Sequence, residues 1–185
     1  MDPPPSFDWD FKDEWSLWVL DNGLPELPAT VSLGQSVPIA RWSDARLGAV
    51  LQVSRDEDEG DDYLDTNVQV FWRTPDGWET SDAEGGSNWL GHNLEAPGLP
   101  PRGVHFAHVH CSGNLCAGDG VAGADASVVE LLDEDGVTRR PIESPLRAFI
   151  VVFDSRTVAT VRVLDESGNA MAEHRYPSPP WSASK

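Results

Sequence analysis

The second half of the chain alternates hydrophobic and polar residues with a period of two, the spacing at which side chains share one face of a β-strand. Short turns, such as Asp133-Glu-Asp-Gly136 and Asp165-Glu-Ser-Gly168, separate the alternating segments. The predicted strands span residues 127–132, 137–142, 146–153, 157–164 and 170–175. Pro141 indicates an edge strand, because proline cannot donate a ladder hydrogen bond. This pattern predicts an all-β fold, with an immunoglobulin-like antiparallel β-sandwich in the C-terminal half.

The clearest local signal in the first half is a hairpin. Residues 67–73 alternate in hydropathy, residues 74–77 (Thr-Pro-Asp-Gly) have turn composition, and Trp78 begins a returning strand. We expect residues 81–87, which are rich in glycine and acidic residues, to form a loop anchored by Trp89.

Two further stretches of the first half bear on the fold. Hydrophobic segments at 37–42 and 47–53 flank Ser43-Asp44, where we expect a turn or the cap of one helical turn. Residues 9–20 fit a helix, with aromatic and aliphatic residues at i, i+4, i+7 and i+8, or a strand. Because Trp, Val and Leu are frequent in strands, we predict a strand from about Trp15.

Proline and glycine divide the chain. The segment 96–103 has the densest Pro and Gly content and is the predicted linker, with seven of the eight tryptophans before it. We therefore predict five regions. The two halves among them either share one hydrophobic core or have one core each. The five regions are a disordered tail at 1–8, a Trp-rich β-rich half at 9–95, the linker at 96–103, the β-sandwich half at 104–176 and a C-terminal tail at 177–185.

Three of the five histidines and both cysteines lie in residues 103–116. Read as a strand, this stretch places on one face Val104, Phe106, His108 and His110, and on the other His105, Ala107, Val109 and Cys111. Ser112-Gly-Asn114 has turn composition, so Cys116 would return beside Cys111 in a short hairpin. We expect residues 117–125, rich in Gly, Ala and Asp, to form a loop.

The histidine pair suggests a metal site. His108 and His110, two residues apart on one strand, can point at the same ion, and Zn²⁺ accepts both histidine nitrogen and cysteine sulfur. The third ligand would come from one of His105, Cys111, Cys116 or His92. Strand histidines on a wet face or at an edge are the favoured interpretation, because a lone His-x-His pair is common and Cys-x₄-Cys is not a characteristic zinc spacing. We therefore predict no cofactor, with Zn as the alternative.

The two cysteines have two possible states. They could form a disulfide across the hairpin if their Cα atoms lie within about 7 Å of each other. The chain start has neither a basic segment nor an apolar segment of a secretory signal, which predicts a cytoplasmic protein and hence two free thiols.

Charge narrows the choice of partners. Lys and Arg number 13 against 31 Asp and Glu, a formal net charge of -18. Nucleic acid and anionic membranes need a basic face, so both are disfavoured, whereas a basic protein partner is compatible. The acidic run at 56–65 does not follow the calcium-loop pattern, because Gly60 stands where that pattern needs an oxygen ligand.

The chain resembles a group of β-rich actinobacterial proteins. The similarity rests on Phe71-Trp-Arg-Thr-Pro-Asp-Gly-Trp-Glu79, on Trp89, and on the strand-and-turn segments at 129–136 and 159–168. These motifs cover about a third of the chain, and the resemblance implies a β-rich fold without implying an activity.

No nucleophile elbow, phosphate loop, dinucleotide fingerprint or His-Glu-x-x-His motif occurs in the sequence. The sequence therefore favours a non-enzymatic, acidic interaction protein with a basic partner. A zinc-binding protein or metal-dependent enzyme using residues 105–116 is the alternative, and mimicry of DNA by the acidic surface is a third, weaker hypothesis.

Overall fold

The computed structural model describes residues 2–55, 64–89, 93–134, 136–154 and 156–176, except for the side chains of residues 82–84, 87 and 108. The predictions for most of the acidic run, for His92 and for the C-terminal tail therefore lie outside the described residues. The described chain has two helical segments and eleven strands. They are η1 Trp9–Phe11, α1 Lys12–Asn22, β1 Gln35–Ser43, β2 Leu47–Arg55, β3 Asp65–Thr74, β4 Gly77–Asn88, β5 Val104–Ser112, β6 Leu115–Ala122, β7 Ala126–Asp133, β8 Gly136–Pro141, β9 Ala148–Asp154, β10 Ala159–Asp165 and β11 Ala170–Tyr176.

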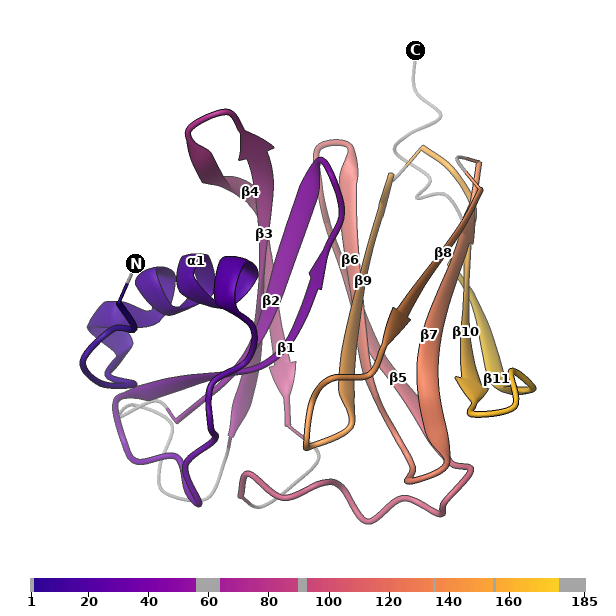
Figure 1. Ribbon diagram of the computed structural model, residues 1–185, viewed down its shortest axis with the longest axis horizontal. Coiled ribbons are helices and arrows are strands. Elements are labelled where there is room, and N and C mark those ends of the chain that lie inside the picture. The colour runs from indigo at the N-terminus through magenta and orange to yellow at the C-terminus, as the bar shows by residue number, and fades with distance from the viewer. Residues whose placement is uncertain (1, 56–63, 90–92, 135, 155, 177–185) are drawn as a thin grey trace.

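The strands form three antiparallel sheets. The first sheet has the order β1-β2-β3-β4, the middle sheet β5-β6-β9 and the third sheet β11-β10-β7-β8. Figure 1 shows α1 on the outer face of the first sheet and the middle sheet between the other two. The all-β, sandwich-type prediction is confirmed, and the immunoglobulin-like topology stays a prediction.

One large hydrophobic cluster joins the three sheets. Its fully buried members include Ile39 and Val70 in the first sheet, Ile150 in the middle sheet and Val161 in the third. The cluster thus contains residues from both predicted halves, so the two halves share a core. A smaller cluster packs α1 against the outer face of the first sheet. The linker at 96–103 stays a prediction.

The strand predicted from about Trp15 is wrong, because residues 12–22 form α1. The helix buries Trp15 and Val19 against the first sheet and directs Ser16 toward Gln69 of β3. Gly23, with φ of 96°, ends it and donates its N–H to the carbonyl of Val19 at 2.9 Å. The i, i+4 spacing of the buried residues decides the structure here, over the strand propensity of their types.

Two predicted loops are strands. β4 continues through the segment 81–87, because β3 is long enough to pair with it as far as Asn88. β6 runs through the predicted loop at 117–125 as far as Ala122. Its glycines leave space for aromatic rings of other strands, since a Cβ on Gly118 would lie 2.9 Å from Tyr176 Oη and one on Gly120 2.5 Å from Phe149 Cζ.

Several other local predictions are confirmed. The strands of the second half occupy β7 to β11, and Pro141 lies in the edge strand β8. The turn at 74–77 joins β3 to β4. Trp89 is buried and donates its indole N–H to the carbonyl of Asn93 at 3.1 Å, so it anchors the chain after β4 as expected.

Candidate functional site

The predicted hairpin of the histidine and cysteine stretch is confirmed as β5 and β6, but the cysteines are not free thiols. Cys111 and Cys116 are direct partners in the ladder, with Cα atoms 4.1 Å apart, and they form a disulfide. The prediction of free thiols is wrong because neighbouring strands place the two residues within bridging distance. In the disulfide, neither sulfur is the thiolate that a zinc ion requires.

A register shift in β5 changes which residues share a face. Phe106 pairs with Gly120 and Val109 pairs with Gly118, so the bulge between them puts these two residues on the same face. The predicted shared face of Phe106 and His110 is therefore wrong. Phe106 stacks on His174 of the third sheet, with ring centroids 5.1 Å apart.

His110 lies on the opposite face, against β4. A Cβ on Gly85 would lie 2.1 Å from His110 Nδ1, so the imidazole packs directly on the backbone of β4. His105 shares this face and is exposed. The side chain of His108 and all of His92 lie outside the described residues.

Within the described part of the chain, no group of three or more His, Cys, Asp or Glu side chains could hold a metal ion. The zinc prediction depends on His108, so it stays a prediction.

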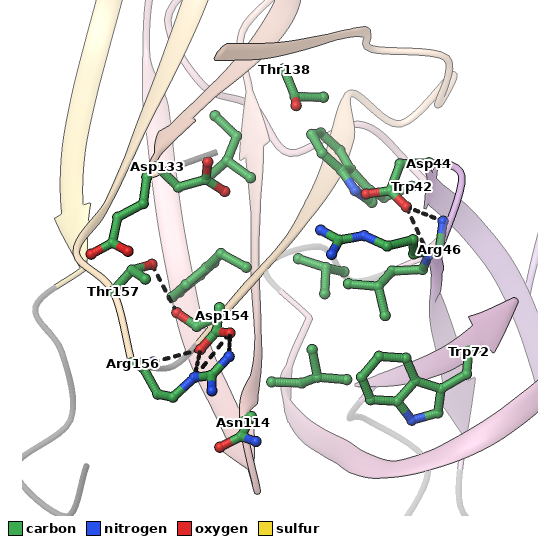
Figure 2. A pocket seen from close by; sticks show the side chains of 16 residues that line it. Trp42, Asp44, Arg46, Trp72, Asn114, Asp133, Thr138, Asp154, Arg156 and Thr157 are labelled. Carbon is green, nitrogen blue, oxygen red and sulfur yellow. Dashed lines mark hydrogen bonds and ion pairs between the residues drawn. The ribbon is translucent and has the colours of Figure 1, made fainter. Parts of the chain in front are cut away.

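A cleft of about 540 Å³ lies where strands of all three sheets end (Figure 2). Its lining comes from the β1–β2 turn, the end of β3, the β5–β6 turn, the β7–β8 region and the end of β9. The residues are Trp42, Asp44, Arg46, Leu47, Trp72, Asn114, Leu115, Leu131, Asp133, Glu134, Thr138, Val152, Phe153, Asp154, Arg156 and Thr157.

The β1–β2 turn holds one side of the cleft in a defined conformation. Asp44 Oδ1 accepts hydrogen bonds from the backbone N–H groups of Arg46 at 2.6 Å and Leu47 at 2.7 Å. This is the local side-chain-to-backbone bonding that stabilises turns with aspartate at their start. As a result, the turn presents Arg46 between Trp42 and Trp72 on this side of the cleft (Figure 2).

Trp42 is buried in the wall of the cleft. Its side chain is only 3% exposed, and the Arg140 guanidinium lies 5.4 Å from its ring centroid. Arg140 is itself anchored, donating two hydrogen bonds to the carbonyl of Ser43 at 3.1 and 3.0 Å. The Trp42 Nε1–H has no hydrogen-bond partner among the described residues. A buried indole usually finds such a partner, so this donor calls for an explanation.

Acidic residues dominate the opposite side. Figure 2 shows Asp133 and the pair of Asp154 and Arg156 across the cleft from the tryptophans. Arg156 Nε donates to Asp154 Oδ1 at 2.9 Å, and its backbone N–H donates to the same oxygen at 2.8 Å. Hydrogen bonding from the Arg156 side chain outweighs desolvation and lowers the pKa of Asp154 below its ordinary value. Asp154 is therefore a stable carboxylate at neutral pH.

The cleft as a whole is acidic and has an aromatic side chain at its opening. Four carboxylates (Asp44, Asp133, Glu134 and Asp154) face two guanidinium groups (Arg46 and Arg156), a formal excess of two negative charges. Trp72 is 45% exposed, although it belongs to β3 and pairs with Leu47 and Glu79 in the ladders. An exposed indole beside carboxylates can bind a cation through its ring face.

Sequence reasoning missed this cleft. Its residues come from five separate segments between Trp42 and Thr157, and no local spacing relates them. The exposed Trp72 lies on the same strand face as the buried Val68 and Val70, so the alternation pattern marks it as another core residue.

No family model, curated protein or solved structure matches the chain. Among the described residues, no helix has both the length and the hydrophobicity needed to cross a membrane. The function is therefore inferred from the geometry of the described residues.

Proposed function

We propose that this protein is a non-catalytic binding protein whose cleft receives a basic segment of a partner protein. The observation that carries the proposal is the composition of the cleft. It combines an excess of carboxylates with an exposed indole ring at Trp72. The cationic side chains of a basic peptide complement both of these features.

Electrostatics supports a cationic partner at two length scales. The net charge of -18 attracts a basic protein over distances of about 10 Å, the screening length at 0.1 M salt. Within the cleft, Glu134 is exposed and available to a cationic side chain. Asp154 already neutralises Arg156, so this arginine adds little repulsion toward such a ligand.

Trp72 supplies the second part of the proposed contact. A Lys or Arg side chain over an exposed indole contributes about 0.5–1 kcal/mol. The protein already uses this contact elsewhere, since the Arg73 guanidinium lies 4.6 Å from the ring centroid of Trp78. Trp72 is exposed beside the acidic cleft, where a partner's cation can reach it.

The proposal keeps a cytoplasmic location, with an immunoglobulin-like topology as its structural frame. The disulfide between Cys111 and Cys116 bears on the location, because such bonds persist mainly in oxidising compartments. Alkylating the thiols in intact cells before lysis tests the location. A cytoplasmic protein should hold the two cysteines reduced in the cells and form the bond only after lysis, whereas a pair already oxidised in the cells would contradict the cytoplasmic assignment.

Calorimetric titration with an acetylated tetralysine amide tests the function. We expect binding that weakens with added salt and that Trp72→Ala reduces by about 2- to 5-fold, the loss of one exposed cation–π contact. The matched control is Trp9→Ala, because Trp9 is similarly exposed at 39% but lies in η1, outside the cleft.

A second pair of variants isolates the charge. Glu134→Gln removes a cleft carboxylate, and Glu95→Gln removes an exposed carboxylate outside the cleft. We expect only Glu134→Gln to weaken the binding of the peptide measurably. Absence of binding, or equal losses in the cleft and control variants, would reject the cleft as the binding site.

A further inference from the structure

Four side chains of alternating charge form a row across the third sheet, which we call the charge row. Glu130 of β7 lies directly opposite Arg139 of β8 and Arg162 of β10, and Arg162 lies opposite Glu173 of β11. Adjacent members form ion pairs, at 2.6 Å for Arg139 and Glu130, 3.4 Å for Arg162 and Glu130, and 2.6 Å for Arg162 and Glu173. We infer that the charge row is the centre of a self-complementary surface through which two copies of this chain form a weak dimer.

The charge row lies on the outer face of the third sheet. Val129 and Val161, which immediately precede two members of the row, are buried in the hydrophobic cluster that joins the three sheets, so the row points away from this cluster. Figure 1 shows the middle sheet on one side of the third sheet and none of the described elements on its other side. Val137, two residues before a member of the row, is 60% exposed. The outer face therefore presents both charged and apolar side chains to a partner.

The order of the charges favours a second copy of the chain as the partner. From β11 to β8 the signs are minus, plus, minus, plus, and a two-fold axis parallel to the strands reverses this order in the facing copy. Arg139 of each copy then lies opposite Glu173 of the other copy. The side chains of these two residues are 66% and 52% exposed, so they can reach each other across the contact. Every charge of the row faces its opposite in this arrangement.

The ion pairs within each copy do not prevent this contact. Arg139 uses Nε for Glu130 in its own chain, and a guanidinium has five N–H donors, so it can bind a second carboxylate. Glu173 accepts from Arg162 at Oε2, and a carboxylate can accept several hydrogen bonds. The dimer therefore adds two symmetry-related ion pairs while each copy keeps its own.

Net charge explains why the contact forms at this face. A formal charge of -18 makes two copies of the chain repel each other. The charge row contains two arginines and two glutamates, so its formal charge is zero. Because charges more than about 8 Å apart are largely screened at 0.15 M salt, the balanced charges at this face act on a second copy more strongly than the distant acidic residues do.

The size of the face predicts a weak dimer. Its four strands have six to eight residues each. With about 4.8 Å between strands and about 3.4 Å per residue, the face covers about 450 Å². Two such faces bury about 900 Å², less than the range of about 1,200–2,000 Å² for stable complexes, so we expect a dissociation constant of about 10–100 µM.

Sedimentation velocity at 0.15 M salt tests the dimer, over protein concentrations that span the expected dissociation constant. We expect the wild-type protein to pass from monomer to dimer. Arg139→Glu and Glu173→Arg each place like charges opposite each other in the dimer, so each variant alone should dimerise at least about 10-fold more weakly. An equimolar mixture of the two variants restores opposite charges at both contacts and should dimerise about as tightly as the wild-type protein. The ion pairs within each chain are the same alone and in the mixture, so recovery reports only on the contact between copies.

Val137→Lys tests the same face if the charge-reversal variants do not fold. Val137 and Arg175 stand at the two ends of the ladder row next to the charge row, so the two-fold axis places them opposite each other. A lysine at position 137 would therefore repel the facing arginine, and we expect it to weaken the dimer about 10-fold. The matched control is Val109→Lys, because Val109 is a strand valine of the middle sheet that is 42% exposed.

A wild-type protein that stays monomeric at every concentration would overturn the proposal. A dimer that the variants at positions 139, 173 and 137 leave unchanged would also overturn it, as would a mixture that stays as weak as its components. Recovery of the dimer in the mixture, with Val109→Lys unchanged, supports the two-fold contact. The cleft is lined from the other face of the third sheet, by Leu131 and Thr138, so these outcomes are independent of the proposed binding of a basic segment.

Discussion

Ser16 Oγ donates a hydrogen bond to Gln69 Oε1 at 2.7 Å, although the two residues lie 53 positions apart in the chain. Gln52 Nε2 donates to the same Ser16 oxygen at 2.8 Å, and Ser36 Oγ donates to Gln52 Oε1 at 2.8 Å. All four side chains are buried between α1 and the first sheet. This polar network gives the helix a defined position, because hydrophobic contacts alone are not directional.

The network predicts the effect of Ser16→Ala. Removing the hydroxyl takes away the Ser16 donor from Gln69 Oε1 and leaves Gln52 Nε2 with only its second acceptor, the carbonyl of Lys12 at 2.8 Å. A buried polar group that loses its partner costs about 1–3 kcal/mol. We expect the free energy of unfolding to fall by about that amount in urea titrations. Ser167→Ala, in the exposed β10–β11 turn, is the control. Equal stability of the two variants would show that the network does not stabilise the helix.

A second prediction concerns the close packing of β6. An alanine Cβ at position 120 would lie 2.5 Å from both the His105 carbonyl oxygen and Phe149 Cζ, distances that force the backbone or ring to move. Gly120→Ala should therefore lower the free energy of unfolding by about 1–3 kcal/mol, the usual cost of overpacking. The control is Gly98→Ala, because a Cβ there has no atom within 4 Å. Full stability of Gly120→Ala would contradict the packing of β6 against β5 and β9.

The disulfide gives a third prediction. Alkylation under denaturing conditions without reductant should label neither Cys111 nor Cys116, as read by intact mass. Replacing both with serine should lower the free energy of unfolding by about 2 kcal/mol, because the bond closes a short loop and short loops confer the smallest entropic gain. Ser112→Ala, next to the pair in the same hairpin, controls for a change of side chain there. Quantitative labelling of both cysteines would restore the thiol prediction.

Asp165 predicts a pH dependence of stability. Its carboxylate accepts the backbone N–H groups of Asn169 at 2.9 Å and Ser167 at 3.0 Å, and it pairs with Arg102 at 3.1 Å. Hydrogen bonding, first of all from the Asn169 backbone, lowers the pKa of Asp165 below its ordinary value of 3.8. The stability that it contributes is therefore complete above about pH 4 and is lost as the pH falls through the lowered pKa.

Urea titrations of Asp165→Asn across this pH range test the linkage. We expect the variant to be less stable than the wild-type protein at neutral pH, with the difference shrinking as the pH drops below about 4. Asp125→Asn, which removes an exposed carboxylate in the β6–β7 turn, is the control variant. A difference that stays constant at every pH would mean that the charge of Asp165 is not responsible.

Local sequence patterns were sufficient to predict the positions of most strands. Alternation and Gly-containing turns place β7 to β11, the β3–β4 hairpin and the edge position of Pro141 correctly, because these signals act between residues close in the chain. These patterns fail where the secondary structure of a segment depends on residues that are distant in the chain. Residues 12–22 form a helix because the first sheet covers the face that carries Trp15 and Val19, which are spaced i, i+4. β6 is a strand despite its glycines because Phe149 and Tyr176 cover them.

The sequence by itself determined the all-β class, the antiparallel hairpins and the acidic net charge. Only the tertiary structure decided the state of Cys111 and Cys116 and the position of the cleft. The cleft joins Trp42 and Trp72 of the first sheet with Asp154 of the middle sheet. The physical reason is the distance along the chain over which each signal acts. Hydropathy period and turn chemistry are properties of neighbouring residues, whereas a site between sheets depends on how their faces pack and where each strand ends.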